Sequence, residues 1–303
     1  MIPVKDFMQK RVAVVSSDST CFFASKRMVE DNTNTLVVTS DSVPVGMITR
    51  RDIIREVIGQ EKDADKALVR EVMTSPVVSI DVNDSLAKAN KLMKRHHIKQ
   101  IVVVENKILA GLITQDDITK AVIKLLADLN KKAERINISV EEFQEISEQF
   151  YMMDGYLDNP DSVPEKVSEI MTNDVVVIPP TLSVLEASKI MGDFAIGSLI
   201  IEFEKMLVGI ITERDMIDRM LIHKKPPADT KISDIMSKPV VSVSPDLKIR
   251  ELIPLLMEKD FSRFPVVYKK KVIGIVTQSD ILKSTLKLVK ATHWRILKKW
   301  GDF

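Results

Sequence analysis

The stretch Gly274-Ile275-Val276-Thr277-Gln278-Ser279-Asp280 decides the fold, because the chain repeats its pattern. It joins a hydrophobic strand pattern to a polar segment that favours a helix. The same Gly-x-x-Thr-x-x-Asp string occurs at Gly46–Asp52, Gly111–Asp117 and Gly209–Asp215, and a methionine stands 38 residues before each of the four glycines. Four copies in one register indicate internal duplication, which has to be recognised before any fold is assigned.

Composition and charge place the chain among globular proteins. Its 303 residues suit about two domains, with 45% apolar and 29% charged residues. A net charge of +1 gives no overall attraction to nucleic acid or anionic membranes. Cys21 is the only cysteine, which excludes an intrachain disulfide or a cysteine zinc cluster. Met1–Asp6 lacks a signal-peptide core, and no apolar run approaches the ~18 residues of a membrane span. We therefore expect a cytoplasmic protein.

Each repeat predicts the order strand, helix, strand, strand, helix, which is an α/β (α+β) fold. The repeats cover residues 4–58, 69–122, 167–221 and 232–286. The first pair and the last pair are each offset by 65 residues, but 33 extra residues separate the second repeat from the third. The spacing therefore predicts two paired modules, residues 1–125 and 167–303, with a helical linker over 126–166.

Two helical segments lie outside the repeat pattern. Within the linker, Ser139–Glu142 fits a capping box that opens a helix with an apolar stripe. The last helix is expected to continue to about Trp300, with lysines between its apolar positions. Such a basic amphipathic helix can contact nucleic acid or a membrane. Packing on the body of the protein, with a solvated lysine face, is the preferred interpretation.

The Thr-x-x-Asp part of each string has two interpretations. Thr277 and Asp280 have the spacing of a capping box, in which both side chains satisfy free backbone N–H groups at the start of a helix. A helix N-terminus also suits phosphate. A carboxylate in the same turn can accept hydrogen bonds from both hydroxyls of a ribose. The combination therefore points to a nucleoside phosphate, with its base in an aliphatic slot.

The four strings resemble those of the CBS (cystathionine β-synthase) domain family. The resemblance also rests on the openings Val167–Met171 and Ile232–Met236 and on Arg263–Val267. It covers nearly the whole chain apart from residues 126–166 and the tail. The resemblance implies that two repeats pack through their sheets into a Bateman module. It further implies that adenosine-containing ligands bind in the clefts, with the aspartate on the ribose and the threonine on ribose or phosphate.

Carrying these roles over to the matching positions gives the candidate ligand contacts. The family often has a basic residue 27 positions after the methionine, and only Arg263 fits here, with Lys99 adjacent to the position in the second repeat. The fourth repeat is thus expected to hold the strongest site and the first repeat the weakest. The candidates are Thr277, Asp280, Arg263, Val240, Val266, Thr212, Asp215, Thr114, Asp117, Lys99, Val77, Thr49 and Asp52.

The sequence thus predicts a regulatory protein that senses AMP, ADP, ATP or a related adenosyl compound, acts on a downstream protein and forms a homodimer. No catalytic residue, resident cofactor or metal site is expected, since adjacent His96 and His97 point apart and have no acidic partner in motif spacing. Two alternatives stay open. One is a ligand-free structural or oligomerisation scaffold. The other is a nucleic-acid or membrane-surface module that uses the basic C-terminal helix.

Overall fold

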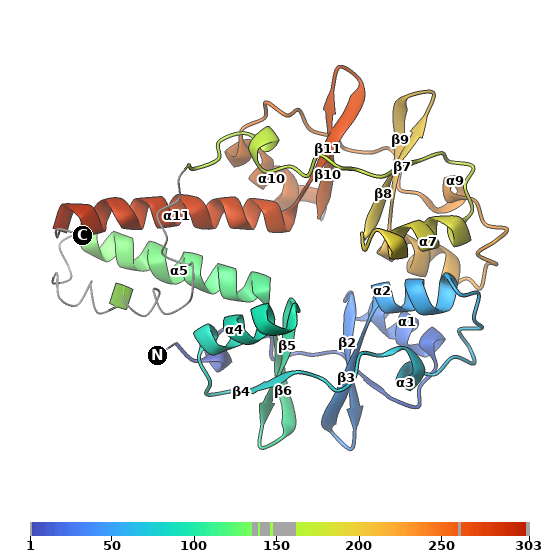
Figure 1. Ribbon diagram of the computed structural model, residues 1–303, viewed down its shortest axis with the longest axis horizontal. Helices are drawn as coiled ribbons and strands as arrows, with labels where there is room; N and C mark the ends of the chain where they lie inside the picture. The colour runs from blue at the N-terminus through green and yellow to red at the C-terminus, as the bar shows by residue number, and fades with distance from the viewer. Residues whose placement is uncertain (1, 135–138, 140–145, 148–161, 260–261, 301–303) are drawn as a thin grey trace.

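The computed structural model describes residues 2–134, 139, 146–147, 162–259 and 262–300, and within them the first three repeats have the expected order of strands and helices (Figure 1). A 3-10 turn, η1 (Val4–Asp6), precedes the first repeat. The first two repeats contain β1 (Val14–Ser16), α1 (Cys21–Glu30), β2 (Thr35–Ser40), β3 (Val43–Thr49), α2 (Arg50–Ile53), the π-helical turn η2 (Ile54–Ile58), α3 (Val69–Val72), β4 (Ser79–Asp81), α4 (Leu86–His96), β5 (Gln100–Glu105), β6 (Ile108–Thr114) and α5 (Gln115–Glu134).

The second pair of repeats follows the same plan. Its elements are η3 (Val167–Glu169), β7 (Val177–Ile178), α7 (Val184–Asp193), β8 (Ser198–Phe203), β9 (Met206–Thr212), α8 (Glu213–Met216), the π-helical turn η4 (Ile217–Leu221), α9 (Ile232–Ile235), α10 (Ile249–Lys259), β10 (Arg263–Tyr268), β11 (Lys271–Thr277) and α11 (Gln278–Trp300).

The first strand of the fourth repeat is not formed, although the sequence predicts one at Val240–Val243. Only Val243 bridges to β10, so this sheet has two strands where the others have three. In the other repeats an N–H group of the second strand donates to the residue just before the first strand, as Val37 does to the carbonyl of Ala13 at 3.0 Å. Pro265 stands at the equivalent position and has no N–H to donate. The prediction of a strand is therefore wrong here.

Within each pair, every string glycine lies against the methionine of the other repeat. A Cβ atom on Gly111 would lie 2.7 Å from the Sδ of Met8, and one on Gly46 would lie 2.5 Å from the Sδ of Met73. Gly209 with Met236, and Gly274 with Met171, repeat the arrangement. The constant spacing of 38 residues thus reflects crosswise contacts between two repeats, and glycine is required because no side chain fits there.

The sheets of the first two repeats pack on each other, and so do those of the last two. Val37, Val102 and Leu112 form a buried cluster between β2, β5 and β6. In the second pair, β9 lies beside β11. The pairing into two modules predicted for the fold is therefore confirmed.

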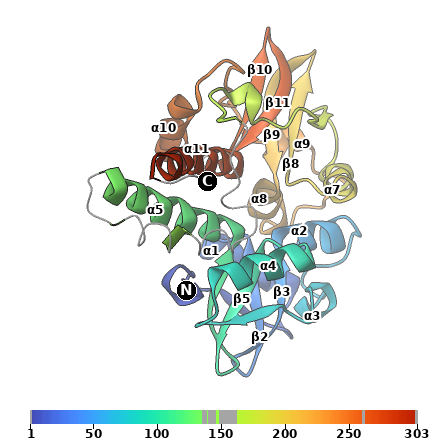
Figure 2. The same ribbon diagram turned by 60° about the vertical axis from the view of Figure 1, so that its left-hand side comes forward.

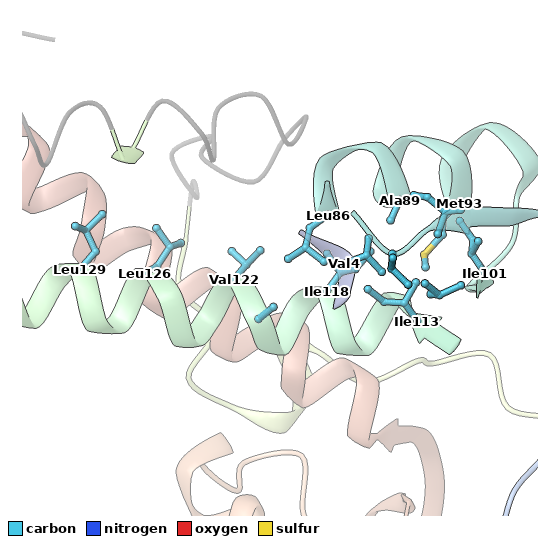
Figure 3. Close-up of a cluster of buried hydrophobic side chains, with 14 of the residues drawn as sticks. Val4, Leu86, Ala89, Met93, Ile101, Ile113, Ile118, Val122, Leu126 and Leu129 are labelled. Carbon is cyan, nitrogen blue, oxygen red and sulfur yellow. The ribbon is translucent and has the colours of Figure 1, made fainter. Parts of the chain in front are cut away.

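The two modules close on each other within the chain (Figure 2). Ile54 and Ile58 of η2 are buried in the core of the third repeat, and Ile217 of η4 is buried in the core of the first. On the other side α5 and α11 lie side by side, and Leu297 joins the cluster that contains Leu126 and Leu129 of α5. Figure 3 shows Val122, Leu126 and Leu129 in a row along α5. Each fully buried aliphatic side chain of this kind contributes about 1.5–3 kcal/mol.

The expected terminal helix is confirmed, and it packs as the preferred interpretation states. α11 directs Ile281 and Leu297 into the core, whereas Lys283, Lys287 and Lys298 are exposed. α5 continues to Glu134, so the expected linker begins inside a helix. The helix predicted from Ser139 lies outside the described residues except at its first position and at Ile146 and Ser147. Among the described helices, none is both long and apolar enough to cross a bilayer.

Candidate functional site

The threonine and aspartate of every string form a cap at the start of a helix. In each repeat the threonine N–H and hydroxyl both donate to one aspartate oxygen, Oδ2, at 2.9 Å and at 2.6–2.7 Å respectively. The aspartate N–H also donates to the threonine hydroxyl in the first three repeats, at 3.1–3.3 Å, so the capping interpretation is correct there, and the fourth repeat has the threonine half of the cap. Capping does not exclude a ligand, because it engages only one carboxylate oxygen of each aspartate.

One cap opens onto a cavity of about 670 Å³, which we call the Asp215 cavity. Thr212 and Asp215 come from the third repeat and Arg263 from the fourth. Arg50 reaches it from the first repeat, so the cavity lies between the two modules. Its volume falls within the range of about 300–1,000 Å³ that is usual for small-molecule sites.

The Asp215 cavity is rich in guanidinium groups. Its four arginines are Arg50, Arg214, Arg219 and Arg263, against the three carboxylates of Glu213, Asp215 and Asp218. Four cations against three anions leave the wall positive, which suits a ligand that carries phosphate. Arginine forms bidentate hydrogen bonds with phosphate oxygens and stays charged at physiological pH.

Two of these arginines, the buried Arg50 and the half-buried Arg263, are only partly satisfied. Arg50 is 5% exposed and donates from one Nη to the carbonyl of Met28 at 3.2 Å. Burial lowers the pKa of Arg50 and of Arg263, and for Arg263 the nearby Glu213 and Asp215 oppose that shift. The Nε atoms of both residues are buried, and neither has a hydrogen-bond partner among the described residues. A buried donor without an acceptor is costly, which favours a site that receives an anion.

The carboxylate of Asp215 is itself held in place. Its second oxygen, Oδ1, accepts a hydrogen bond from the hydroxyl of Ser237 at 2.9 Å and lies 3.3 Å from an Nη atom of Arg219. Asp215 is only 6% exposed. A ribose that binds this carboxylate would have to displace Ser237 or share the oxygen with it.

A second cavity of about 490 Å³ lies at the cap of the second repeat, and we call it the Asp117 cavity. Thr114 and Asp117 line it together with Thr49 of the first repeat and with Lys99. The amide of Gln9 donates to Oδ2 of Asp117 at 2.9 Å. Within the described part of the chain, Oδ1 of Asp117 has no hydrogen-bond partner, so it can accept from a ribose without displacing a protein group.

The structure groups the candidate residues differently from the sequence in one respect. Arg263 lines the Asp215 cavity, whereas Thr277 and Asp280 line neither of these two cavities. Arg263 and Thr277 are backbone partners in the β10–β11 pair, but the hydroxyl of Thr277 turns into its own cap. A basic residue at this position therefore faces the cap of the partner repeat, following the crosswise pattern of the methionines and glycines. Asp52 lines neither cavity, although Thr49 does.

The three valines expected to contact the base, Val77, Val240 and Val266, line neither of these two cavities. Val266 is 0% exposed and belongs to the core of the fourth repeat, because strand β10 directs it inward. Val77 packs against the cluster between the first two sheets. Val240 is half-buried and lines neither cavity. Ile210 is the large aliphatic residue in the wall of the Asp215 cavity.

Sequence reasoning missed several groups that line the Asp215 cavity. Arg219 and Ser237 contact Asp215 directly, and Asn34 extends from the first repeat. The sequence does contain a signal for Ser237, which directly follows Met236. The crosswise arrangement brings the residue after this methionine to the cap of the other repeat in the pair. Arg50 directly follows the cap residue Thr49 of the first repeat, and its sequence position gives no sign that it reaches the third repeat.

Across the described ranges, no group of three or more histidine, cysteine, aspartate or glutamate side chains could hold a metal ion. His96 and His97, at the end of α4, are exposed.

Four stretches of the chain match the CBS domain family, over residues 4–59, 69–124, 167–222 and 232–287. The protein therefore belongs to the CBS domain family. Uncharacterized protein MK0525 of Methanopyrus kandleri is 38% identical over 138 residues, which are 45% of this chain and 70% of that protein. The CBS domain-containing protein CBSCBSPB1 of Arabidopsis thaliana is 25% identical over 294 residues, which are 93% of this chain. The chain spans 53% of that relative's length.

A solved structure shares the whole arrangement. Protein MJ1225 of Methanocaldococcus jannaschii, described as a proposed archaeal homologue of g-AMPK, has a TM-score of 0.67 and 20% identity. The similarity covers 93% of this chain and 99% of that one. At this level of identity it shows the fold alone.

Proposed function

We propose that this protein is a regulatory sensor of adenine nucleotides, namely AMP, ADP, ATP or a related adenosyl compound. The ligands occupy the Asp215 and Asp117 cavities. Within the CBS domain family such a role needs no catalytic residue, and we propose none. The protein transmits the bound state to a downstream protein in the cytoplasm.

One observation carries the proposal. In the Asp215 cavity a capped carboxylate stands beside the guanidinium groups of Arg50 and Arg263, whose Nε atoms are buried and have no partner among the described residues. A ribose supplies donors to a carboxylate, and a phosphate supplies acceptors to the guanidinium groups. A nucleotide supplies both at once, whereas bare phosphate or a nucleoside supplies only one of them.

The position of the cavity supports a mechanism for signalling. Residues of the first, third and fourth repeats line it, so one ligand contacts both modules. Binding favours whichever arrangement of the modules gives the ligand the better contacts, and the population shifts toward it. The surface that the two closed modules present to a downstream protein then differs between the empty and occupied states.

Ligand-dependent stability tests the proposal. If AMP, ADP or ATP binds only the folded protein, the ligand raises the free energy of unfolding by about 2.7 kcal/mol at ~100 times its dissociation constant. A thermal-shift screen with adenine compounds and inorganic phosphate measures this. The absence of a shift with every adenine compound at saturating concentration would contradict the proposal.

Thr277 and Asp280 stay a prediction for a further site. Oδ1 of Asp280 has no hydrogen-bond partner in the described part of the chain, so the carboxylate keeps the acceptor that a ribose needs. Asp280→Asn preserves the shape of the side chain and removes its charge. Titration calorimetry then compares the number of nucleotides bound by the variant and by the unaltered protein.

A ligand-free scaffold is the second candidate, and the caps themselves favour it. The caps of the first three repeats are complete without a ligand, and Oδ1 of Asp215 is occupied by Ser237 and Arg219. In a scaffold, Asp215→Asn lowers the melting temperature but has no nucleotide affinity to reduce. In a sensor, the same variant weakens binding by about ten-fold or more, which corresponds to ~1.4 kcal/mol.

The expected homodimer also remains a prediction. Residues of both modules line each cavity, because the two modules close on each other within the chain. We therefore propose that nucleotide binding does not require dimerisation. Sedimentation equilibrium, with and without AMP, gives the oligomeric state and shows whether the ligand changes it.

A further inference from the structure

The two cavities share part of their walls. Glu213 and Asn34 line both the Asp215 cavity and the Asp117 cavity. Glu213 is the first residue of α8, directly after the cap residue Thr212. Its side chain is 18% exposed, so it lies between the two cavities with little access to bulk solvent.

On the side of the Asp117 cavity, Glu213 is paired with an arginine. Its Oε1 accepts a hydrogen bond from Nε of Arg51 at 3.0 Å. Arg51 comes from the first repeat and lines the Asp117 cavity. The carboxylate thus neutralises a cation that a phosphate in that cavity would otherwise use.

On the side of the Asp215 cavity, Glu213 stands next to Arg263. A Cβ atom added to Gly197 would lie 3.1 Å from Oε1 of Glu213 and 3.6 Å from an Nη atom of Arg263. Glycine therefore leaves room for the carboxylate and the guanidinium group to lie side by side. Glu213 and Arg263 form no ion pair with each other in the described part of the chain. Nε of Arg263 has no partner among the described residues either. One carboxylate is thus within reach of two phosphate-binding cations and holds one of them.

We propose that Glu213 couples the two cavities negatively, as an internal anion that competes with ligand phosphate. The inference rests on the proposed function. A phosphate on Arg263 fixes Glu213 on Arg51 and so weakens phosphate binding in the Asp117 cavity. A phosphate on Arg51 releases Glu213 toward Arg263 and weakens binding in the Asp215 cavity. Because coupling between two sites is reciprocal, both effects have the same size.

Titration calorimetry with AMP measures this coupling. Asp117→Asn weakens the Asp117 cavity, so AMP binds first to the Asp215 cavity. Asp215→Asn does the reverse. The two variants therefore give the affinity of each cavity while the other is empty, which is its intrinsic affinity. In the unaltered protein the second AMP is expected to bind about ten-fold more weakly than its intrinsic affinity, within the ~5–150-fold range of such couplings. The same comparison is made with Glu213→Gln present in every protein. The loss of affinity for the second AMP is then expected to be less than two-fold.

Two further variants make the result specific. Arg51→Gln removes the other half of the ion pair, so it also abolishes the coupling. Because it releases Glu213 toward Arg263, it should weaken AMP binding in the Asp215 cavity even when the Asp117 cavity is empty. Glu56→Gln is the matched control, because Glu56 pairs with Arg55 at 2.7 Å and lines neither cavity. It should keep the full coupling.

The outcomes separate the inference from the function on which it rests. A deficit that persists in Glu213→Gln and shrinks with added salt means that the two phosphates repel each other directly, which overturns the role of Glu213. Independent binding of two AMP molecules in the unaltered protein overturns the coupling but not the sensor. If no AMP binds, the proposed function fails, and the inference fails with it.

Discussion

At the scale of single residues, the string glycines make the sharpest prediction about stability. A Cβ atom on Gly111 would lie 2.7 Å from Sδ of Met8 and 2.8 Å from the carbonyl oxygen of Gln9. The carbonyl belongs to the backbone and cannot turn aside. Gly111→Ala is therefore expected to lower the free energy of unfolding by about 1–3 kcal/mol, which is typical of overpacking. Urea denaturation measures the change.

A second glycine provides the control for this prediction. A Cβ atom on Gly192, in α7, would meet only Cγ of Arg55, at an ordinary contact distance of 3.6 Å. Gly192→Ala should be neutral or stabilise the protein by about 0.5–1 kcal/mol, because alanine restricts the unfolded chain. Equal effects of the two substitutions would contradict the crosswise packing.

Arg263 makes the prediction that concerns the ligand. Arg263→Ala should weaken the binding of ATP most and that of adenosine least, because a guanidinium group contacts phosphate oxygens and not a nucleoside. Hydrogen bonds to charged groups contribute about 1.5–3 kcal/mol each, so the loss for a nucleotide should exceed ten-fold. Calorimetry with adenosine, AMP and ATP checks the order. The same loss for all three ligands would place Arg263 away from the phosphates.

At the scale of secondary structure elements, the α5–α11 pair carries a histidine that should make stability depend on pH. His293 of α11 is 0% exposed, and its Nδ1 lies 2.8 Å from Oδ1 of Asn130 in α5. Burial lowers the pKa of His293 from 6.5 to about 4. The unfolded chain therefore takes up a proton at a higher pH than the folded protein does. Stability should fall as the pH drops from about 6.5 to about 4, by at most ~3 kcal/mol.

The pH prediction can be assigned to this histidine because the other three, His96, His97 and His223, are exposed. Chemical denaturation across the pH range gives the slope, and carboxylates contribute to it as well. His293→Leu removes the titrating group, so its slope between pH 6.5 and pH 4 should be smaller than that of the unaltered protein. An unchanged slope would mean that His293 is protonated in the folded state.

The elements also show how far the sequence predicts the fold. Hydrophobic periodicity and the repeated string identify the hairpins, and they identify α11 as far as Trp300, because these depend on local patterns. The missing strand in the fourth repeat could not be predicted from hydrophobicity, since Val240–Val243 has the right pattern. The cause lies on the neighbouring strand, where Pro265 lacks the donor.

The site was predicted less completely than the fold, for a similar reason. Local chemistry identifies the Thr-x-x-Asp caps and Arg263. Which cap faces which arginine depends on how the two repeats interlock and on how the two modules close. Arg50 enters the Asp215 cavity from another module, and no spacing within the chain records that contact.

At the scale of the whole molecule, the contacts within a module differ from those between modules. Residues 1–134 contain both crosswise contacts of the first module, Gly46 with Met73 and Gly111 with Met8, and the cluster at Val102. A protein ending at residue 134 should therefore fold. One ending between residues 59 and 68 should not, because it lacks Met73 and the second sheet. Circular dichroism and urea denaturation of the two fragments test this difference.

The folded fragment should then associate with itself. Ile54 and Ile58 are 2% exposed in the full chain, where the third repeat covers them, and Leu126 and Leu129 lie in the cluster that α11 completes. Removing residues after 134 exposes these side chains, and each large aliphatic side chain costs about 1.5–3 kcal/mol in water. A second copy of the fragment presents the same two faces and can bury them. Sedimentation equilibrium should therefore show a fragment dimer, and Ile54→Ser with Ile58→Ser should weaken it. If the fragment stays monomeric and does not bind a hydrophobic dye, the contacts between the two modules contribute little to stability. Closure of the modules on each other would then have to depend on the ligand.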